Sequence, residues 1–124
     1  MNAVAEEVTD QMVEEGLPTP VGYKLLIALP KSDETFGDSG ILKPEMIKKQ
    51  DEVATVIGLV LDMGPDAYND KEKFPNGPWC KVGDYIIIRT YSGTRFKLYG
   101  QEYRLINDDT VEGIVSDPRG YSRA

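Results

Sequence analysis

The sequence contains no histidine and only one cysteine, Cys80. Without histidine the chain cannot form a Ser-His-Asp triad, a Cys-His dyad or an imidazole proton shuttle. A structural zinc site needs about four cysteine or histidine ligands, and one cysteine cannot form an intramolecular disulfide. Paired carboxylate chemistry stays open, because 21 residues are acidic, although no pair stands out in the sequence.

Long hydrophobic runs are also missing. No apolar run approaches the ~20 residues of a membrane span, and the first residues lack the basic and apolar regions of a secretory signal. A lone cysteine fits a reducing compartment. We therefore expect a cytoplasmic protein with no membrane partner, and a chain of 124 residues predicts one domain.

The charge is acidic and uneven. The net charge is −7, and residues 1–20 carry five acidic residues and no basic one. Residues 81–104 carry five basic and two acidic residues, with aromatic residues between them. Such a strand surface can stack bases and hold phosphates. Because the chain as a whole is acidic, a solvated outer face over an aromatic core is the preferred interpretation, and a nucleic-acid-binding barrel remains the alternative.

Period-two apolar patterns separated by turn signals predict an all-β protein. The predicted strands are 23–29, 53–61, 85–88, one around 95–98, 102–106 and 111–115. Gly58 inside the second strand suggests a bulge. Residues 1–17 form a short helical stripe that ends at Gly16 and Pro18, and predict either a frayed arm or a docked helix. Six short strands without a convincing internal helix indicate a small antiparallel barrel or sandwich.

Residues 31–52 form a loop that is unusually long for a small domain. The loop is polar, yet Ile41 and Leu42 stand as an apolar pair directly after Gly40. The pair either folds back onto the barrel or docks into the groove of a partner as the loop becomes ordered. Two other candidates are best explained structurally: Cys80 as a small apolar core residue, and Asp108-Asp109 as a turn between strands.

Several segments in the same order resemble the GroES-type co-chaperonins, the chaperonin-10 family. The segments that carry the resemblance are Gly58 to Pro65, Lys81-Val-Gly-Asp84, Tyr91 to Arg95, Tyr103 to Ile114, and the mobile-loop motif Gly40-Ile41-Leu42-Lys43-Pro44-Glu45. The resemblance covers about 95 residues, roughly 21–115. Lys43 stands where the family motif has an apolar residue, and this departure suits a divergent member such as one from a bacterial virus.

The resemblance implies a GroES-like β-barrel domain over residues 18–117, with an extension at 1–17 and a tail at 118–124. The domain would include a mobile loop at 31–52 and a loop at 66–80 in the place of the family's roof hairpin. The resemblance also implies a non-enzymatic lid: a homo-oligomer, expected to be a heptamer, that needs no cofactor, caps a GroEL-type chaperonin and encloses an unfolded client. The chaperonin, and not this chain, would bind ATP or ADP. If the source is viral, this protein would act in the cytoplasm of the host. A viral structural ring protein is a further alternative.

The resemblance assigns chaperonin binding to Gly40, Ile41, Leu42, Lys43 and Pro44. For ring closure we expect the first strand to pair with the last strand of a neighbouring subunit, because a head-to-tail contact closes a ring and covers both edges. The expected interface residues are Tyr23, Leu25, Ile27, Val111, Ile114 and Val115.

Overall fold

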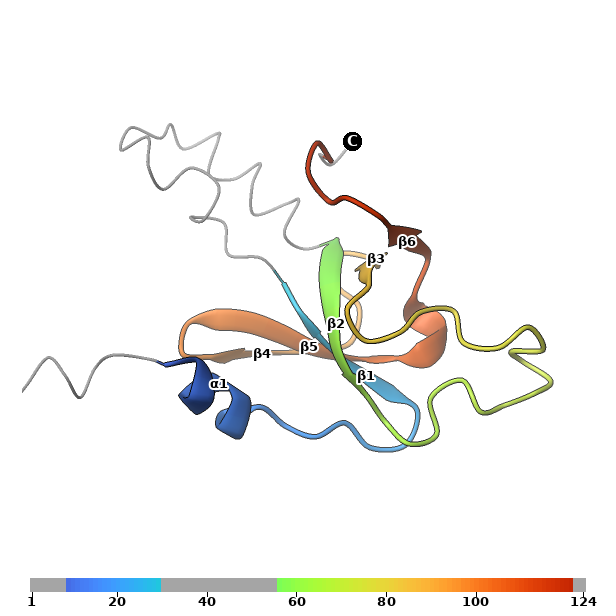
Figure 1. Ribbon diagram of the computed structural model, residues 1–124, viewed down its shortest axis with the longest axis horizontal. Helices are drawn as coiled ribbons and strands as arrows, with labels where there is room; N and C mark the ends of the chain where they lie inside the picture. Colours follow the sequence, from blue (N-terminus) through green and yellow to red (C-terminus); the bar gives the residue numbers. More distant parts are fainter. Residues whose placement is uncertain (1–8, 30–55, 122–124) are drawn as a thin grey trace, which may run out of the picture.

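One antiparallel sheet dominates the computed structural model, which describes residues 9–29 and 56–121 (Figure 1). Its strands are β1 (Lys24–Ala28), β2 (Ile57–Met63), β3 (Tyr85–Ile87), β4 (Thr94–Leu98), β5 (Gln101–Asn107) and β6 (Gly113–Val115). Their order is β4-β5-β1-β2-β3-β6. The sheet is strongly twisted, so that β2 crosses over β4 and β5 in Figure 1. The predicted all-β fold class is confirmed.

Strand β1 lies in the interior of the sheet. It pairs with β2 on one side and with β5 on the other, so that Leu25 lies opposite both Met63 and Ile106. Leu25 and Ile27 are completely buried. Residues 24–28 therefore use both of their hydrogen-bonding edges within the chain. The expected interface with a neighbouring subunit stays a prediction.

The irregularity expected at Gly58 lies elsewhere in the same strand. Leu26 pairs with Asp62 while Ile27 pairs with Val60, so Leu61 is the extra residue of a bulge. Gly58 pairs regularly with β3. A Cβ atom at Gly58 would lie 3.0 Å from Cδ1 of Ile27, so the glycine there permits close packing across the sheet.

The hydrophobic core joins the sheet to segment 64–80, which connects β2 to β3. Its buried residues are Leu25, Ile27, Leu29, Val60, Tyr68, Phe74, Cys80, Ile86, Ile88, Ile106 and Val111. Three of them, Tyr68, Phe74 and Cys80, come from the connecting segment, which the sequence predicted as a loop with only Cys80 in the core. That segment is therefore part of the folded body.

The short helix α1 (Asp10–Gly16) precedes the sheet. The Thr9 side chain accepts a hydrogen bond from the Met12 backbone N–H and caps the helix. The helix ends at Gly16 as the sequence predicts, and Leu17 is already extended. Within residues 9–29 and 56–121 no helix has the length and hydropathy needed to cross a membrane.

A close backbone approach fixes the entry into β1. A Cβ atom on Gly64 would lie only 2.2 Å from the carbonyl oxygen of Gly22. That carbonyl also accepts a hydrogen bond from the Asp66 N–H at 2.9 Å. The turn after β2 and the turn before β1 therefore pack backbone to backbone, and only glycine fits at position 64.

We predict that Gly64→Ala lowers the free energy of unfolding by about 2 kcal/mol or more, because the added methyl meets backbone that cannot move aside. Chemical denaturation followed by circular dichroism measures the change. Gly113→Ala is the matched control, since its Cβ would lie 3.8 Å from the nearest atom. An equal loss in both variants would contradict the packing explanation.

Candidate functional site

The predicted chaperonin-binding residues Gly40, Ile41, Leu42, Lys43 and Pro44 lie outside the described residues. The structure does describe the two positions between which the segment runs. Leu29 is buried and its N–H donates to the Glu102 carbonyl at 3.0 Å. The Val56 carbonyl accepts from the Ile88 N–H at 2.9 Å. The two residues that flank segment 30–55 are thus held in the sheet, Leu29 by β5 and Val56 by the residue that follows β3.

The six predicted interface residues divide into two groups. Four of them are buried: Leu25, Ile27, Val111 and Val115. Only Tyr23 and Ile114 are exposed, with exposed fractions of 49% and 50%. Tyr23 lies just before β1, whereas Ile114 lies on β6, which β2 and β3 separate from β1 in the sheet. The structure therefore does not bring the first and last strands together within one chain.

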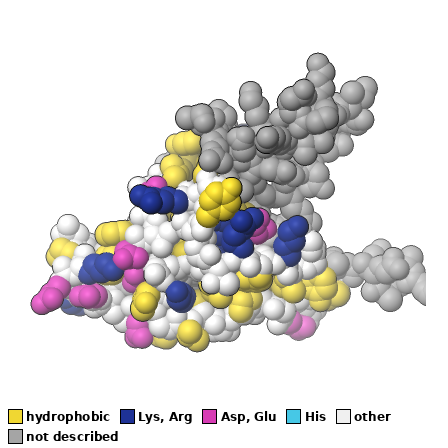
Figure 2. Space-filling model, turned by 180° about the vertical axis from the view of Figure 1, so that it is seen from behind, with side chains coloured by type: hydrophobic (Ala, Val, Ile, Leu, Met, Phe, Trp, Pro, Cys, Tyr) yellow, Lys and Arg dark blue, Asp and Glu magenta, His cyan; other side chains and the backbone are white. Residues whose placement is uncertain are grey.

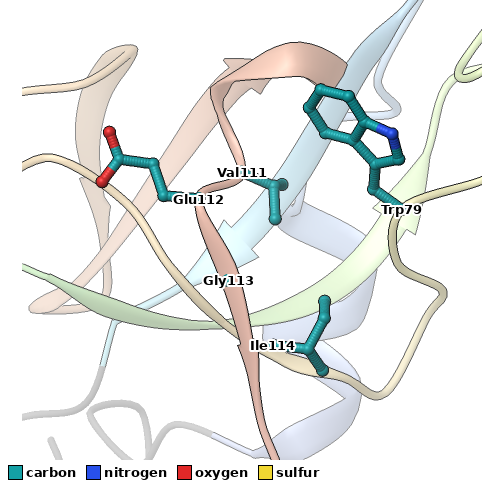
Figure 3. Close-up of a pocket in the computed structure, with 5 residues that line it drawn as sticks. All are labelled: Trp79, Val111, Glu112, Gly113 and Ile114. Atoms are coloured by element: carbon teal, nitrogen blue, oxygen red, sulfur yellow. The ribbon is translucent and has the colours of Figure 1, made fainter.

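A cavity of about 320 Å³ lies beside β6, and we call it the β6 groove (Figure 3). It is lined by Trp79, Val111, Glu112, Gly113 and Ile114. The Glu112 carboxylate points away from Trp79 in Figure 3 and accepts a hydrogen bond from Arg89 Nε at 3.2 Å. The wall shared by Trp79 and Ile114 is apolar, and both side chains are about half exposed.

An aromatic cluster holds Trp79 in place. The ring of Phe74 makes edge-to-face contacts with Tyr68 at 4.8 Å and with Trp79 at 4.9 Å between ring centroids. Such pairs contribute about 0.5–1.5 kcal/mol beyond the area that they bury. Tyr68 has φ of 61°, a left-handed conformation that is costly for a bulky residue. The cluster therefore fixes the position of Trp79 at the groove.

The Tyr68 hydroxyl and the Cys80 thiol form a buried hydrogen bond with an O–S distance of 3.4 Å. Burial raises the pKa of the Cys80 thiol, and burial likewise raises the pKa of the Tyr68 hydroxyl. A raised pKa keeps the thiol protonated at neutral pH, whereas a reactive cysteine needs the thiolate. Cys80 is thus a core residue, as the sequence suggested, and not a nucleophile.

The two neighbouring carboxylates Asp108 and Asp109 have different structural roles. Both lie in the short 3-10 helix η2 (Asp108–Thr110) between β5 and β6. Asp108 is buried and accepts a hydrogen bond from the Tyr68 N–H at 2.9 Å. Asp109 is half exposed and pairs with Lys73. The two residues form a turn that fastens segment 64–80 to the sheet rather than an acid–base pair.

The basic strand surface differs from the expectation at one residue. Arg104 is completely buried, although the sequence placed it among the solvated basic residues. Its Nε donates to Glu102, which also accepts from Arg95, and its Nη1 donates to the carbonyls of Thr90 and Ser92. The basic side chains on the face in Figure 2 are spread out and interspersed with acidic ones. On this face the described residues therefore form no continuous phosphate-binding track.

In the part of the chain that the structure describes, no group of three or more Asp, Glu, Cys or His residues could hold a metal ion. The features that the sequence analysis missed are the β6 groove and the residues just before β1, where Val21 has an exposed fraction of 72%. The sequence did contain a signal for the exposed residues before β1, because residues 17–23 form an uncharged stretch in a chain that is 28% charged.

Comparison with known proteins gives a consistent family. The sequence model described as "Chaperonin 10 Kd subunit" matches residues 18–115. The chain is 35% identical over 98 residues to "Co-chaperonin GroES" of Caldicellulosiruptor saccharolyticus, covering 79% of this chain and 96% of that protein. It is 31% identical over 96 residues to the protein of the same name from Acetivibrio thermocellus, covering 77% of this chain and 95% of the relative.

The chain therefore belongs to the chaperonin 10 family of co-chaperonins. The family match begins at residue 18 and so includes every strand, whereas helix α1 lies outside it. The comparisons show neither a viral source nor a number of subunits.

We predict that Asp108→Ala lowers the free energy of unfolding by about 1–3 kcal/mol, because it leaves the buried Tyr68 N–H without an acceptor. Asp109→Ala is the matched control and removes only an exposed ion pair, which contributes at most about 1 kcal/mol. Denaturant titration compares the two. Equal losses would mean that the Asp108 hydrogen bond does not fasten segment 64–80.

Proposed function

We propose that the protein is a ring-shaped lid that binds a GroEL-type chaperonin in its nucleotide-bound state and encloses a folding client. The observation that carries the proposal is the family match over residues 18–115, because it spans the entire sheet and the intervening Gly40–Glu45 motif. The co-chaperonin names of the relatives agree with the proposal.

Chaperonin binding is assigned to Ile41 and Leu42, supported by Gly40, Lys43 and Pro44. Two apolar side chains that enter a groove on the partner each contribute about 1.5–3 kcal/mol of burial. Ordering the surrounding residues costs about 1–2 kcal/mol per residue. One segment alone should therefore bind weakly, and Lys43 in place of an apolar residue weakens the contact further.

Several weak contacts on one ring would bind strongly together. A ring of seven subunits presents seven copies of the motif, and linked contacts gain roughly 10²–10⁴ in avidity over a single one. Because each contact remains weak, a change in the chaperonin can release the lid. The nucleotide and its hydrolysis belong to the chaperonin in this proposal, and the lid performs no catalytic step of its own.

The residues on either side of segment 30–55 support this proposal. The Leu29 N–H donates to the Glu102 carbonyl on β5, and the Val56 carbonyl accepts from the N–H of Ile88, directly after β3, so the motif lies between two chain positions that are held in the sheet.

We predict that Ile41→Asp or Leu42→Asp abolishes lid binding while the ring still assembles. Each loop loses about 1.5–3 kcal/mol, which is roughly 10–100-fold per contact, and the loss multiplies over the ring. Native mass spectrometry of the protein alone, and then with a purified GroEL-type double-ring chaperonin and ATP, measures both properties. Ile47→Asp makes the same change outside the motif and should leave binding intact.

Undiminished binding of both motif variants would overturn the assignment of the contact. A wild-type ring that never binds the chaperonin would instead favour a structural ring protein. A salt-dependent shift of a labelled oligonucleotide, lost in Arg95→Ala, would favour the nucleic-acid-binding alternative.

A further inference from the structure

We propose that the chain carries a second contact surface for the GroEL-type chaperonin, formed by Tyr91, Arg95 and Lys97 and complementary to an acidic patch on that partner. We call these three residues the Tyr-Arg surface. The proposal rests on the proposed function, because it specifies how the body of the lid, and not only the Gly40–Glu45 motif, meets the chaperonin.

Tyr91 is the most exposed of the large hydrophobic residues in the part of the chain that the structure describes, with an exposed fraction of 78%. The Arg95 guanidinium lies 5.7 Å from the centroid of its ring, within the range of a cation–π contact. Arg95 and Lys97 are two positions apart on β4, so both side chains project from the same face of the strand. Tyrosine and arginine are enriched among the residues that dominate binding energy at protein interfaces.

The turn that carries Tyr91 is held in one conformation by Arg104. The guanidinium of Arg104 is completely buried, and its Nη1 donates to the carbonyls of Thr90 and Ser92, the residues on either side of Tyr91. At the end of the turn, Gly93 has φ of 76° and lies so close to β5 that a Cβ atom would be 2.5 Å from a backbone oxygen of that strand. A side chain on a turn that is already ordered loses little freedom when it binds.

The burial of Arg104 is costly for the fold. Among the described residues its Nη2 has no hydrogen-bond partner, although the atom is buried. An apolar residue of similar volume in place of a buried ion pair is often neutral or stabilising. The position of the Tyr91 turn therefore explains a buried cation that the stability of the sheet does not require.

The Tyr-Arg surface lies beside both positions between which the motif-bearing segment runs. The Glu102 carboxylate accepts a hydrogen bond from Arg95 Nε at 3.2 Å, and the carbonyl of the same residue holds Leu29. On the other side, Ile88 holds Val56 and is followed directly by the turn. A partner that engages the motif is thereby brought next to this surface.

The local charge favours an acidic protein as the partner. Three basic residues, Arg95, Lys97 and Arg104, share one acidic neighbour, Glu102, which gives a local charge of +2 in a chain of net charge −7. Such a small basic area does not follow the backbone of a nucleic acid, which needs a longer track. A few charged pairs around an aromatic anchor are sufficient at a protein interface.

The first test measures the affinity of the full chain for a purified GroEL-type chaperonin with ATP at ionic strengths from about 50 to about 500 mM. Lys97→Glu should bind roughly tenfold more weakly at low salt, and its affinity should depend less on salt than that of the wild type. Lys71→Glu is the matched control and should behave as the wild type. It makes the same charge change in segment 64–80, which projects away from β4 in Figure 1.

The second test removes the aromatic anchor. Tyr91→Ser should weaken chaperonin binding about tenfold, because the side chain at the centre of the contact is lost. Tyr99→Ser, in the turn at the other end of β4, is the matched control at a residue that is 47% exposed. Both changes are at exposed positions, so circular dichroism and native mass spectrometry should show the wild-type fold and assembly.

The third test examines Arg104 as a positioning residue. Arg104→Met should speed hydrogen exchange at the Ser92 N–H, which donates to the Arg89 carbonyl across the turn, and should weaken chaperonin binding. Arg104→Lys should restore part of both, because an ammonium group still donates to backbone carbonyls. Wild-type affinity in Arg104→Met despite the faster exchange would overturn this role.

Wild-type affinity and salt dependence in both Tyr91→Ser and Lys97→Glu would overturn the contact and leave the lid proposal standing. A wild-type protein that never binds the chaperonin would overturn both. A lower yield of folded client at unchanged chaperonin affinity would assign the surface to the client instead. A salt-dependent shift of a labelled oligonucleotide that is lost in Lys97→Glu would assign it to nucleic acid.

Discussion

The double pairing of β1 is the constraint on which the rest of the structure depends. Because β2 and β5 occupy both of its edges, β1 joins the two halves of the sheet and buries Leu25 and Ile27 completely. Among the described residues, β4 and β6 are thereby left as the two outer strands of the sheet.

The same constraint connects the turn at Gly64 with the start of β1. Gly22 ends the approach to β1, and its carbonyl is held by the turn after β2. The backbone contact between Gly64 and Gly22 thus fixes where the chain enters β1. On the other side of the core, Asp108 and the aromatic cluster set the position of Trp79.

Sequence patterns predicted the strands well, because alternation and turn residues are local signals. The apolar run of 23–29 identified β1, and Gly16 marked the end of the helix. The position of β1 in the sheet was not predictable, since it depends on pairing between residues far apart in the chain. The burial of Arg104 was missed for the same reason: its partners at Thr90 and Ser92 meet it only once the sheet has formed.

The candidate site likewise has one part that a local sequence pattern predicts and one part that depends on residues far apart in the chain. The motif from Gly40 to Glu45 is a local pattern, so the sequence alone could nominate it through a family resemblance. The β6 groove combines Trp79 with residues 111–114, which lie more than thirty positions further along the chain. No local pattern joins them.

The anchoring of segment 30–55 on adjacent strands has a consequence for how such a protein can change over time. Segment 30–55 connects β1 to β2, and these two strands pair with each other. Because the cost of closing a loop grows only slowly with its length, residues can be inserted between the two strands with little loss of stability. The length of this segment can therefore change while the pairing of β1 with β2 stays the same.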